Sequence, residues 1–195
     1  ENGVDRVIYS STSSAYGLIN SPPLTEDMPN DCLNPYSVTK VAGEELCKMY
    51  TKLFGVKTLI FRYFNVYGER QPIKGQYAPV VGIFLCQTEA GEPMTIVGDG
   101  LQRRDFTHVS DVVDANMLAM NTESANIWSQ TYNIGTGKNY SVLELAKMIG
   151  TKYTHIPERL GEARVTLADI TKAKSSLGWQ PKVELKDWIK GYTDV

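Results

Sequence analysis

The sequence has little of several features that would assign it to a special class of protein. Its 3 cysteines are an odd number without the spacing of metal ligands, which favours a reducing compartment over a disulfide framework. The 20 basic residues nearly balance the 22 acidic ones, and the net charge of -2 argues against nucleic acid as the main partner. No apolar run approaches the ~18 residues of a membrane span, and no signal peptide is recognisable. We therefore expect a cytoplasmic protein that binds neither nucleic acid nor a membrane.

Length and composition instead indicate an ordinary globular fold. With 195 residues, of which 42% are hydrophobic and 22% charged, the chain can bury a full core. Short β-rich apolar runs alternate with segments of helical periodicity, which predicts an α/β fold with a mostly parallel sheet. The predicted strands are Val7–Ser10, Val56–Tyr63, Met94–Val97, Asp105–Val109 and Thr131–Ile134. The predicted helices run from Tyr36 to Gly55, from Pro79 to Ala90, from the N-cap Ser110 to Met120, from the N-cap Ser141 to Met148 or Ile149, and from Asp169 to Leu177.

Tyr36 and Lys40 stand four residues apart at the start of a predicted helix, which puts both side chains on one helix face. A hydroxyl-rich segment, Ser10–Ser14, follows the first predicted strand. A free phenol, with a pKa of about 10, is a poor base near neutrality, but a nearby ammonium favours the phenolate. The pair is therefore a candidate acid–base centre. The alternative is a surface tyrosine beside a solvated lysine.

Six motifs in a fixed order resemble the extended branch of the short-chain dehydrogenase/reductase family, which acts on nucleotide-activated sugars. They are Ser10–Gly17 with Tyr36 and Lys40, Arg62–Gly68, Gly98–Phe106, Tyr132–Gly135, Arg159–Glu162, and the segment from Ala168 through Leu177 to Pro181. The resemblance covers essentially the whole chain. It implies the C-terminal part of a Rossmann-type doubly wound parallel sheet, interleaved with a small α/β substrate-binding domain. Residues 1–70 would be the second half of the cofactor domain, and residues 71–195 mainly the nucleotide-sugar domain, with segments near 105–135 returning to the Rossmann sheet.

One motif of that family is missing. Its members begin with a strand, a Gly-x-x-Gly-x-x-Gly turn and a helix that holds the dinucleotide pyrophosphate. None of the 16 glycines makes this pattern after an N-terminal strand, and the chain enters a predicted strand at Val7 without an initiator Met. We expect the C-terminal portion of a longer enzyme, with the apolar edge of its sheet exposed or covered by another chain. We expect neither tight NAD binding nor epimerase activity from this chain alone.

The resemblance implies roles for five residues around NAD. Tyr36 would take a proton from a sugar hydroxyl while hydride passes to NAD. Lys40 would also hold the nicotinamide ribose, and Thr12 would hydrogen-bond the same sugar oxygen. Ser10 and Tyr63 would lie on the nicotinamide side.

The resemblance also implies a site for the nucleotide sugar. Asn65, Arg104 and Arg159 would contact the diphosphate, for which guanidinium groups are well suited. Glu162 would orient the nucleotide ribose or Arg159, and the backbone of Thr95–Val97 would face a uracil. For a single Arg or Asn, a salt bridge or a turn cap is the common alternative. Tyr77–Val81 resembles the helix start on the nucleotide side, although Pro79 and Gly82 depart from the usual order.

Ser13 and Ser14 bear on which reaction the family member performs. Related dehydratases carry Asp-Glu at these two places, and related decarboxylases carry Glu at the second. Without the acid pair, oxidation at C4 has no evident next step except return of the hydride, which implies a UDP-hexose 4-epimerase. Thr166 lies seven residues after Arg159, where epimerases restricted to glucose and galactose often carry Tyr, so we expect N-acetylated sugars to be accepted.

Other readings stay open from sequence alone. The chain could belong to a uronate epimerase, a dehydratase, a decarboxylase or a keto-sugar reductase of the same family. It could also be a non-catalytic nucleotide-sugar-binding subunit. A homodimer is a further expectation, because members of the family that this chain resembles commonly dimerise through the helix that matches Tyr36 and a second helix, which this chain lacks.

Overall fold

A parallel three-stranded sheet organises the first part of the molecule. In the computed structural model, which describes residues 3–73, 75, 78–158 and 163–193, its strands are β1 (Arg6–Thr12), β2 (Lys57–Tyr63) and β7 (Gln130–Ile134), in the order β1-β2-β7. Thr12 lies opposite Tyr63, and Tyr63 lies opposite Ile134. Because the strands are parallel, these three residues mark one edge of the sheet, where the carboxyl ends of the strands meet.

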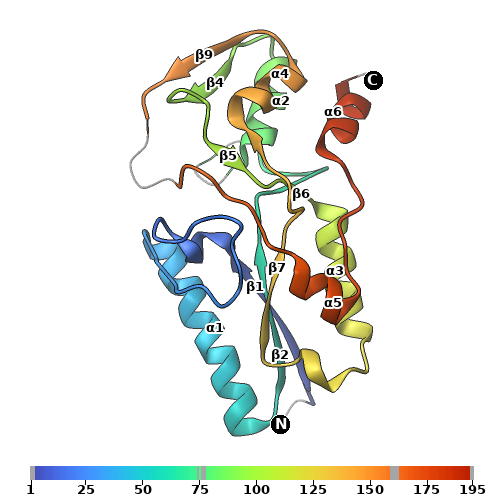
Figure 1. Cartoon of the computed structure of the whole chain (residues 1–195). Coiled ribbons are helices and arrows are strands. Elements are labelled where there is room, and N and C mark those ends of the chain that lie inside the picture. The colour runs from blue at the N-terminus through green and yellow to red at the C-terminus, as the bar shows by residue number, and fades with distance from the viewer. Residues whose placement is uncertain (1–2, 74, 76–77, 159–162, 194–195) are drawn as a thin grey trace.

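Helices cover both faces of this sheet. Figure 1 shows α1 (Pro35–Phe54) on one side and α3 (Val109–Asn121) and α5 (Thr171–Leu177) on the other. The ends of α1 follow from local chemistry, since Asn34 and Ser37 form a reciprocal capping box and Gly55 ends the helix in the left-handed region. The middle of β2 is buried from Thr58 to Arg62, as expected for a strand covered on both faces.

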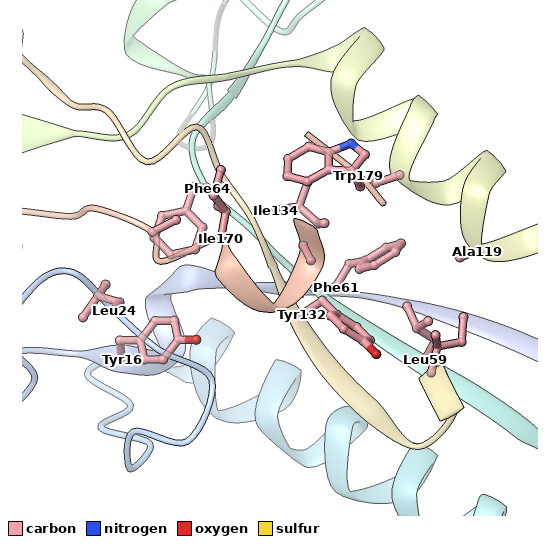
Figure 2. Close-up of a cluster of buried hydrophobic side chains, with 14 residues drawn as sticks. Tyr16, Leu24, Leu59, Phe61, Phe64, Ala119, Tyr132, Ile134, Ile170 and Trp179 are labelled. Atoms are coloured by element: carbon pink, nitrogen blue, oxygen red, sulfur yellow. The ribbon is translucent and has the colours of Figure 1, made fainter. Parts of the chain in front are cut away.

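Aromatic side chains from distant segments form the core of this layer. The rings of Phe61 and Tyr132 meet edge to face with centroids 6.4 Å apart. Trp179 is fully buried and donates from Nε1 to the carbonyl oxygen of Asp111 at 2.9 Å. Figure 2 shows these residues with Tyr16, Leu24, Leu59, Phe64, Ala119, Ile134 and Ile170. Residues around 168–179 therefore belong to the core of the β1-β2-β7 sheet, in addition to the segments near 105–135 that were predicted to return to it. The predicted domain boundary at residue 70 stays a prediction.

A second group of elements lies beyond the carboxyl edge of the sheet (Figure 1). It comprises α2 (Val80–Glu89), β4 (Met94–Val97), α4 (Val142–Ile149), β9 (Tyr153–Ile156) and α6 (Leu185–Thr193). Strand β4 pairs in parallel with β9, and the helices pack around a separate cluster that includes Phe84, Met94, Ile96, Leu145 and Ile189. The short strands β3 (Val66–Tyr67), β5 (Arg103–Arg104), β6 (Thr107–His108) and β8 (Tyr140–Ser141), and the 3-10 turns η1 (Ser13–Tyr16) and η2 (Ala125–Ile127), complete the chain.

The predicted strand Asp105–Val109 and the predicted N-cap Ser110 are wrong. Only Thr107 and His108 form a strand, and α3 begins at Val109. His108 is the N-cap, because its backbone is extended and its Nδ1 accepts a hydrogen bond from the Ser110 N–H at 3.2 Å. The histidine is buried at the strand end, not in a strand interior.

The apolar face of α1 does not point into the core. Leu46, Tyr50 and Leu53 are exposed, whereas the helix residues that are buried are Ser37 and Glu44. The helical period was therefore predicted correctly, but β1 and β2 contact the polar face of the helix. None of the helices in the described ranges has both the length and the apolar character needed to cross a membrane.

Candidate active site

Lys40 lies between Tyr36 and the carboxyl end of β1. Its Nζ donates to the carbonyl oxygen of Ser10 at 2.9 Å and lies 5.8 Å from the centre of the Tyr36 ring. The ring of Tyr9 lies on another side of the ammonium, with its centre at 5.4 Å. Tyr36 is 43% exposed. The predicted pair and the predicted Ser10 are thus brought together.

Two contacts hold α1 close to β1. Gly43 permits the approach, since a Cβ there would lie 2.1 Å from the phenol oxygen of Tyr9. One residue further, Glu44 is buried and accepts hydrogen bonds from Ser11 and from Arg62. Tyr36, Lys40 and Glu44 are spaced by four residues, so these contacts fix which face of α1 meets the strand.

Thr12 closes β1 and starts the next turn. Its Oγ1 accepts from the Ser14 N–H at 3.1 Å and caps η1, and its side chain is nearly buried. On the neighbouring strand, the Tyr63 hydroxyl accepts from Ser10 Oγ at 3.4 Å and from Asn116 Nδ2 at 3.1 Å. The predicted cofactor-side residues Ser10 and Tyr63 therefore lie together at this edge, and Asn116, on α3, was not predicted.

Two cavities adjoin this edge, and they share three residues. One, the Ser13 cavity, has a volume of about 190 Å³ and is lined by Ser13, Ser14, Asn65, Arg104 and Thr166 among others. The other, the Thr95 cavity, has a volume of about 450 Å³ and is lined by Thr95, Val97 and Gln102 among others. Ser14, Asn65 and Arg104 line both. The predicted residues Asn65, Arg104 and Thr166 thus line the Ser13 cavity, and the predicted Thr95 and Val97 line the neighbouring Thr95 cavity.

Asn65, Arg104 and Thr166, the predicted residues that line the Ser13 cavity, all form hydrogen bonds with the backbone of residues 103–105. Asn65 donates from Nδ2 to the carbonyl oxygen of Asp105 at 3.1 Å. Thr166 accepts at Oγ1 from the Asp105 N–H at 3.4 Å and donates its own N–H to the Arg103 carbonyl at 3.0 Å. Arg104 donates from Nη1 to the same carbonyl at 3.0 Å. A guanidinium and an amide held side by side can bind phosphate oxygens.

The backbone groups predicted to face a base already have partners. The Thr95 N–H donates to Gln87 Oε1 at 3.0 Å, and the Val97 carbonyl accepts from Gln102 Nε2 at 3.0 Å. Of the two glutamines, Gln102 also lines the Thr95 cavity. Neither was predicted, although Gln102 lies within the Gly98–Phe106 motif. Arg159, Glu162 and Tyr77 lie outside the described residues.

Burial keeps the neighbouring phenols neutral. It raises the pKa of Tyr16 to about 12, although the charge of Arg62 and the hydrogen bond to Asn133 oppose the rise. Burial, followed by the nearby Cys47 and Glu44, also raises the pKa of Tyr9. Both are therefore poor bases near neutrality. The described ranges contain no group of three or more His, Cys, Asp and Glu side chains that could hold a metal ion.

Comparison with known proteins identifies the family of the chain. Residues 1–135 match the model of the NAD dependent epimerase/dehydratase family. A putative UDP-glucose 4-epimerase of Methanocaldococcus jannaschii is 41% identical over 194 residues, which cover 96% of this chain and 61% of that protein.

Two solved structures are similar as well. The UDP-glucose 4-epimerase of Thermotoga maritima, solved with UDP-glucose, matches with a TM-score of 0.90 and 36% identity over 98% of this chain and 63% of that one. The UDP-glucuronic acid 4-epimerase of Bacillus cereus, solved with UDP-glucuronic acid and NAD, matches with a TM-score of 0.86 and 37% identity over 97% and 60%. These likenesses confirm the predicted Rossmann-type α/β fold. The chain spans about 60% of the length of these relatives, and it belongs to the NAD dependent epimerase/dehydratase family.

Proposed function

We propose that this chain forms part of an NAD-dependent enzyme that epimerises UDP-hexoses at C4. The observation that carries the proposal is the position of Lys40, between Tyr36 and Ser10, at the sheet edge that adjoins the Ser13 and Thr95 cavities. This geometry places a candidate acid–base pair at the same end of β1 as Ser13 and Ser14, which line the Ser13 cavity.

The described residues fit the nicotinamide end of NAD. Lys40 carries three N–H groups and donates one of them to the Ser10 carbonyl, so its ammonium lies at the edge where we propose that a nicotinamide ribose hydroxyl accepts from it. The glycine-rich turn that would hold the pyrophosphate is absent from the sequence. We propose that it is supplied by further residues of a longer protein, in keeping with the 61% share of the relative's length.

The proposed reaction uses one acid–base residue twice. When bound, NAD supplies a reversible hydride acceptor at this edge. Tyr36 takes the proton from the C4 hydroxyl as that carbon becomes a carbonyl, and returns the proton when the hydroxyl forms again on the opposite face. Thr12 hydrogen-bonds the same oxygen, and Asn65 and Arg104 hold the diphosphate while the sugar turns.

The lining of the Ser13 cavity supports epimerisation over dehydration. Its described lining residues include Ser13 and Ser14 but no Asp, Glu, His or Lys. Elimination of water needs an acid and a base beside the sugar. Ser13 and Ser14 supply no such pair, which supports return of the hydride as the next step of a 4-keto sugar.

Thr166 supports a broader substrate range. It lines the Ser13 cavity, and its side chain is small. A small residue at this place leaves room for a 2-acetamido group, so we propose that UDP-N-acetylglucosamine is accepted besides UDP-glucose. The cytoplasmic location and the homodimer stay predictions.

The test uses the longer protein, purified with its bound nicotinamide quantified. It is incubated separately with UDP-glucose, UDP-N-acetylglucosamine and UDP-glucuronic acid, and the C4 epimers are resolved by NMR. We expect the first two to interconvert with their epimers without net NADH formation. Turnover of UDP-glucuronic acid alone would reassign the enzyme as a uronate epimerase, and no epimerisation by an NAD-loaded protein would overturn the proposal.

A further inference from the structure

The carboxylate of Asp105 is buried at the centre of a set of hydrogen-bond donors. Its side chain is 0% exposed. Oδ1 accepts from the Thr136 N–H at 2.8 Å and from Thr136 Oγ1 at 2.7 Å. Oδ2 accepts from the Gly137 N–H at 3.0 Å and from the Ala168 N–H at 3.1 Å. Each carboxylate oxygen thus has two donors, from segments far apart in the sequence.

The loop Gly135–Lys138 resembles an anion-binding loop, but its N–H groups are directed at a carboxylate of the same chain. Consecutive backbone N–H groups in such loops form concave anion sites. Here Asp105 fills the concavity, and Gly135 lets it approach, since a Cβ at Gly135 would lie 3.0 Å from Oδ2 and 2.4 Å from the Cβ of Ala168. The loop is therefore a fixed anchor for Asp105, not a site for an external phosphate.

The backbone of Asp105 reaches the other way, toward the Ser13 cavity. Its carbonyl accepts from Asn65 Nδ2 at 3.1 Å, and its N–H donates to Thr166 Oγ1 at 3.4 Å. Arg104 is its neighbour in the chain. Asn65, Arg104 and Thr166 line the Ser13 cavity, and Asp105 does not. One buried residue therefore touches or adjoins three polar residues of the candidate substrate site.

We propose that Asp105 is a positioning residue for the nucleotide-sugar site. Its carboxylate fixes the 104–106 backbone against the Gly135–Lys138 loop and Ala168, and that backbone sets the positions of Asn65, Arg104 and Thr166. The inference rests on the proposed function, because it assigns these three side chains to substrate binding. Asparagine cannot replace Asp105, because either orientation of its amide would turn an NH₂ group toward two N–H or O–H donors.

Thr136 offers a milder way to loosen the anchor. Its hydroxyl donates to Asp105 Oδ1 and accepts from the Lys138 N–H, and the residue lines neither the Ser13 nor the Thr95 cavity. Thr136→Val keeps the shape and removes the hydroxyl. Thr136→Ser keeps the hydroxyl and serves as the matched control. An effect of Thr136→Val on substrate affinity therefore cannot come from direct contact with either cavity, and passes through the residues that the Gly135–Lys138 loop holds, Asp105 first among them.

The experiment compares wild type, Thr136→Val, Thr136→Ser and Asp105→Asn in the longer, NAD-loaded protein. UDP affinity is measured by calorimetry, and kcat and KM are measured with UDP-glucose. We expect Thr136→Val to raise the Kd for UDP and the KM by about three- to tenfold with kcat and NAD content nearly unchanged, in line with the loss of one charge-assisted hydrogen bond. Thr136→Ser should stay within about twofold of wild type.

If Asp105→Asn folds, it should raise the Kd for UDP by more than tenfold. If it does not fold, the comparison of Thr136→Val with Thr136→Ser tests the inference. A role in folding alone would lower the amount of active enzyme, and therefore kcat, at constant KM. Thr136→Val with the wild-type Kd and KM would overturn the inference. Wild type that fails to bind UDP would overturn the proposed function itself, a different result from equal binding by wild type and variant.

Discussion

Glu44 and Arg62 form an ion pair that is almost fully removed from water between α1 and β2. The side chains are 0% and 3% exposed, and Arg62 reaches the carboxylate through Nε at 2.9 Å and Nη2 at 2.7 Å. The guanidinium also donates to Asn30 and lies 4.7 Å from the centre of the Tyr16 ring. The pair thus links α1, β2 and the loop after β1 in one buried contact.

Removing one partner of this pair should cost much of the stability of the chain. Glu44→Gln leaves the Arg62 cation buried without its anion, and we expect the free energy of unfolding to fall by about 3 kcal/mol or more. The double change Glu44→Met with Arg62→Met should recover at least half of that loss, because it removes both charges. Urea unfolding measures each value.

Glu45 provides the matched control for that experiment. It is the next residue of α1 and pairs with Lys48 on the surface, so Glu45→Gln should change stability by less than about 0.5 kcal/mol. Equal losses in the free energy of unfolding for Glu44→Gln and Glu45→Gln would show that the buried ion pair contributes no more to stability than the surface pair.

A glycine pair tests the close approach of α1 to β1. Gly43→Ala should destabilise the chain by about 1–3 kcal/mol, because the new methyl group meets the ring of Tyr9. Gly191→Ala, in α6 with open space around it, should stabilise the chain by up to about 1 kcal/mol. Melting temperatures that move in the same direction for both variants would contradict this.

The role of Tyr36 predicts a specific kinetic loss. In the longer protein, Tyr36→Phe should lower kcat by roughly 10²- to 10⁴-fold, because the phenol hydroxyl that moves the proton is gone. UDP binding should be nearly unchanged. Tyr50→Phe, on the same helix, should retain wild-type kcat. Normal turnover by Tyr36→Phe would remove this residue from the proposed mechanism.

Tyr16 should make the stability of the chain depend on alkaline pH. Its folded-state pKa is about 12, raised from 10.0 chiefly by burial. Between these values the unfolded chain loses a proton that the folded chain keeps, so stability falls as pH rises from about 10 to about 12. Over this range the Tyr16 phenol lowers the free energy of unfolding by roughly 1.4 kcal/mol per pH unit.

Tyr16→Phe should show a shallower fall than wild type over the same range. The variant will be less stable at pH 8 as well, because it loses the hydrogen bond to Asn133. The difference between the two slopes, measured by urea unfolding at several pH values, is therefore the decisive quantity. Parallel slopes would contradict the assignment.

Local signals predicted some elements almost completely. Helix α4 was predicted from the capping box of Ser141 and Glu144, and the structure has both halves of that box. Gly55 and Gly178 end their helices in the left-handed region as expected. These features depend on residues within one turn of each other, so a single sequence contains the whole signal.

Features that depend on distant partners were missed. Nothing near Glu44 indicates that Arg62 will neutralise it, so the burial of this polar face of α1 was not predicted. Helix α6 was not predicted, because it is short and its apolar residues are covered only when α4 packs on it. In the site, Tyr36 and Lys40 were predicted because their spacing stands among motifs that resemble a known family, but the anchoring of Asp105 by Thr136 spans 31 residues and has no such signal.

Strand β1 has a practical consequence for reconstituting the proposed enzyme. Within the described chain it has one neighbour, β2, so one side of its backbone carries hydrogen-bonding groups available to another strand. A separately expressed segment that carries the glycine-rich turn could dock there by strand addition. The protein is thus suited to fragment complementation, in which NAD retention by the mixture, and by neither piece alone, reports that the sheet has been completed.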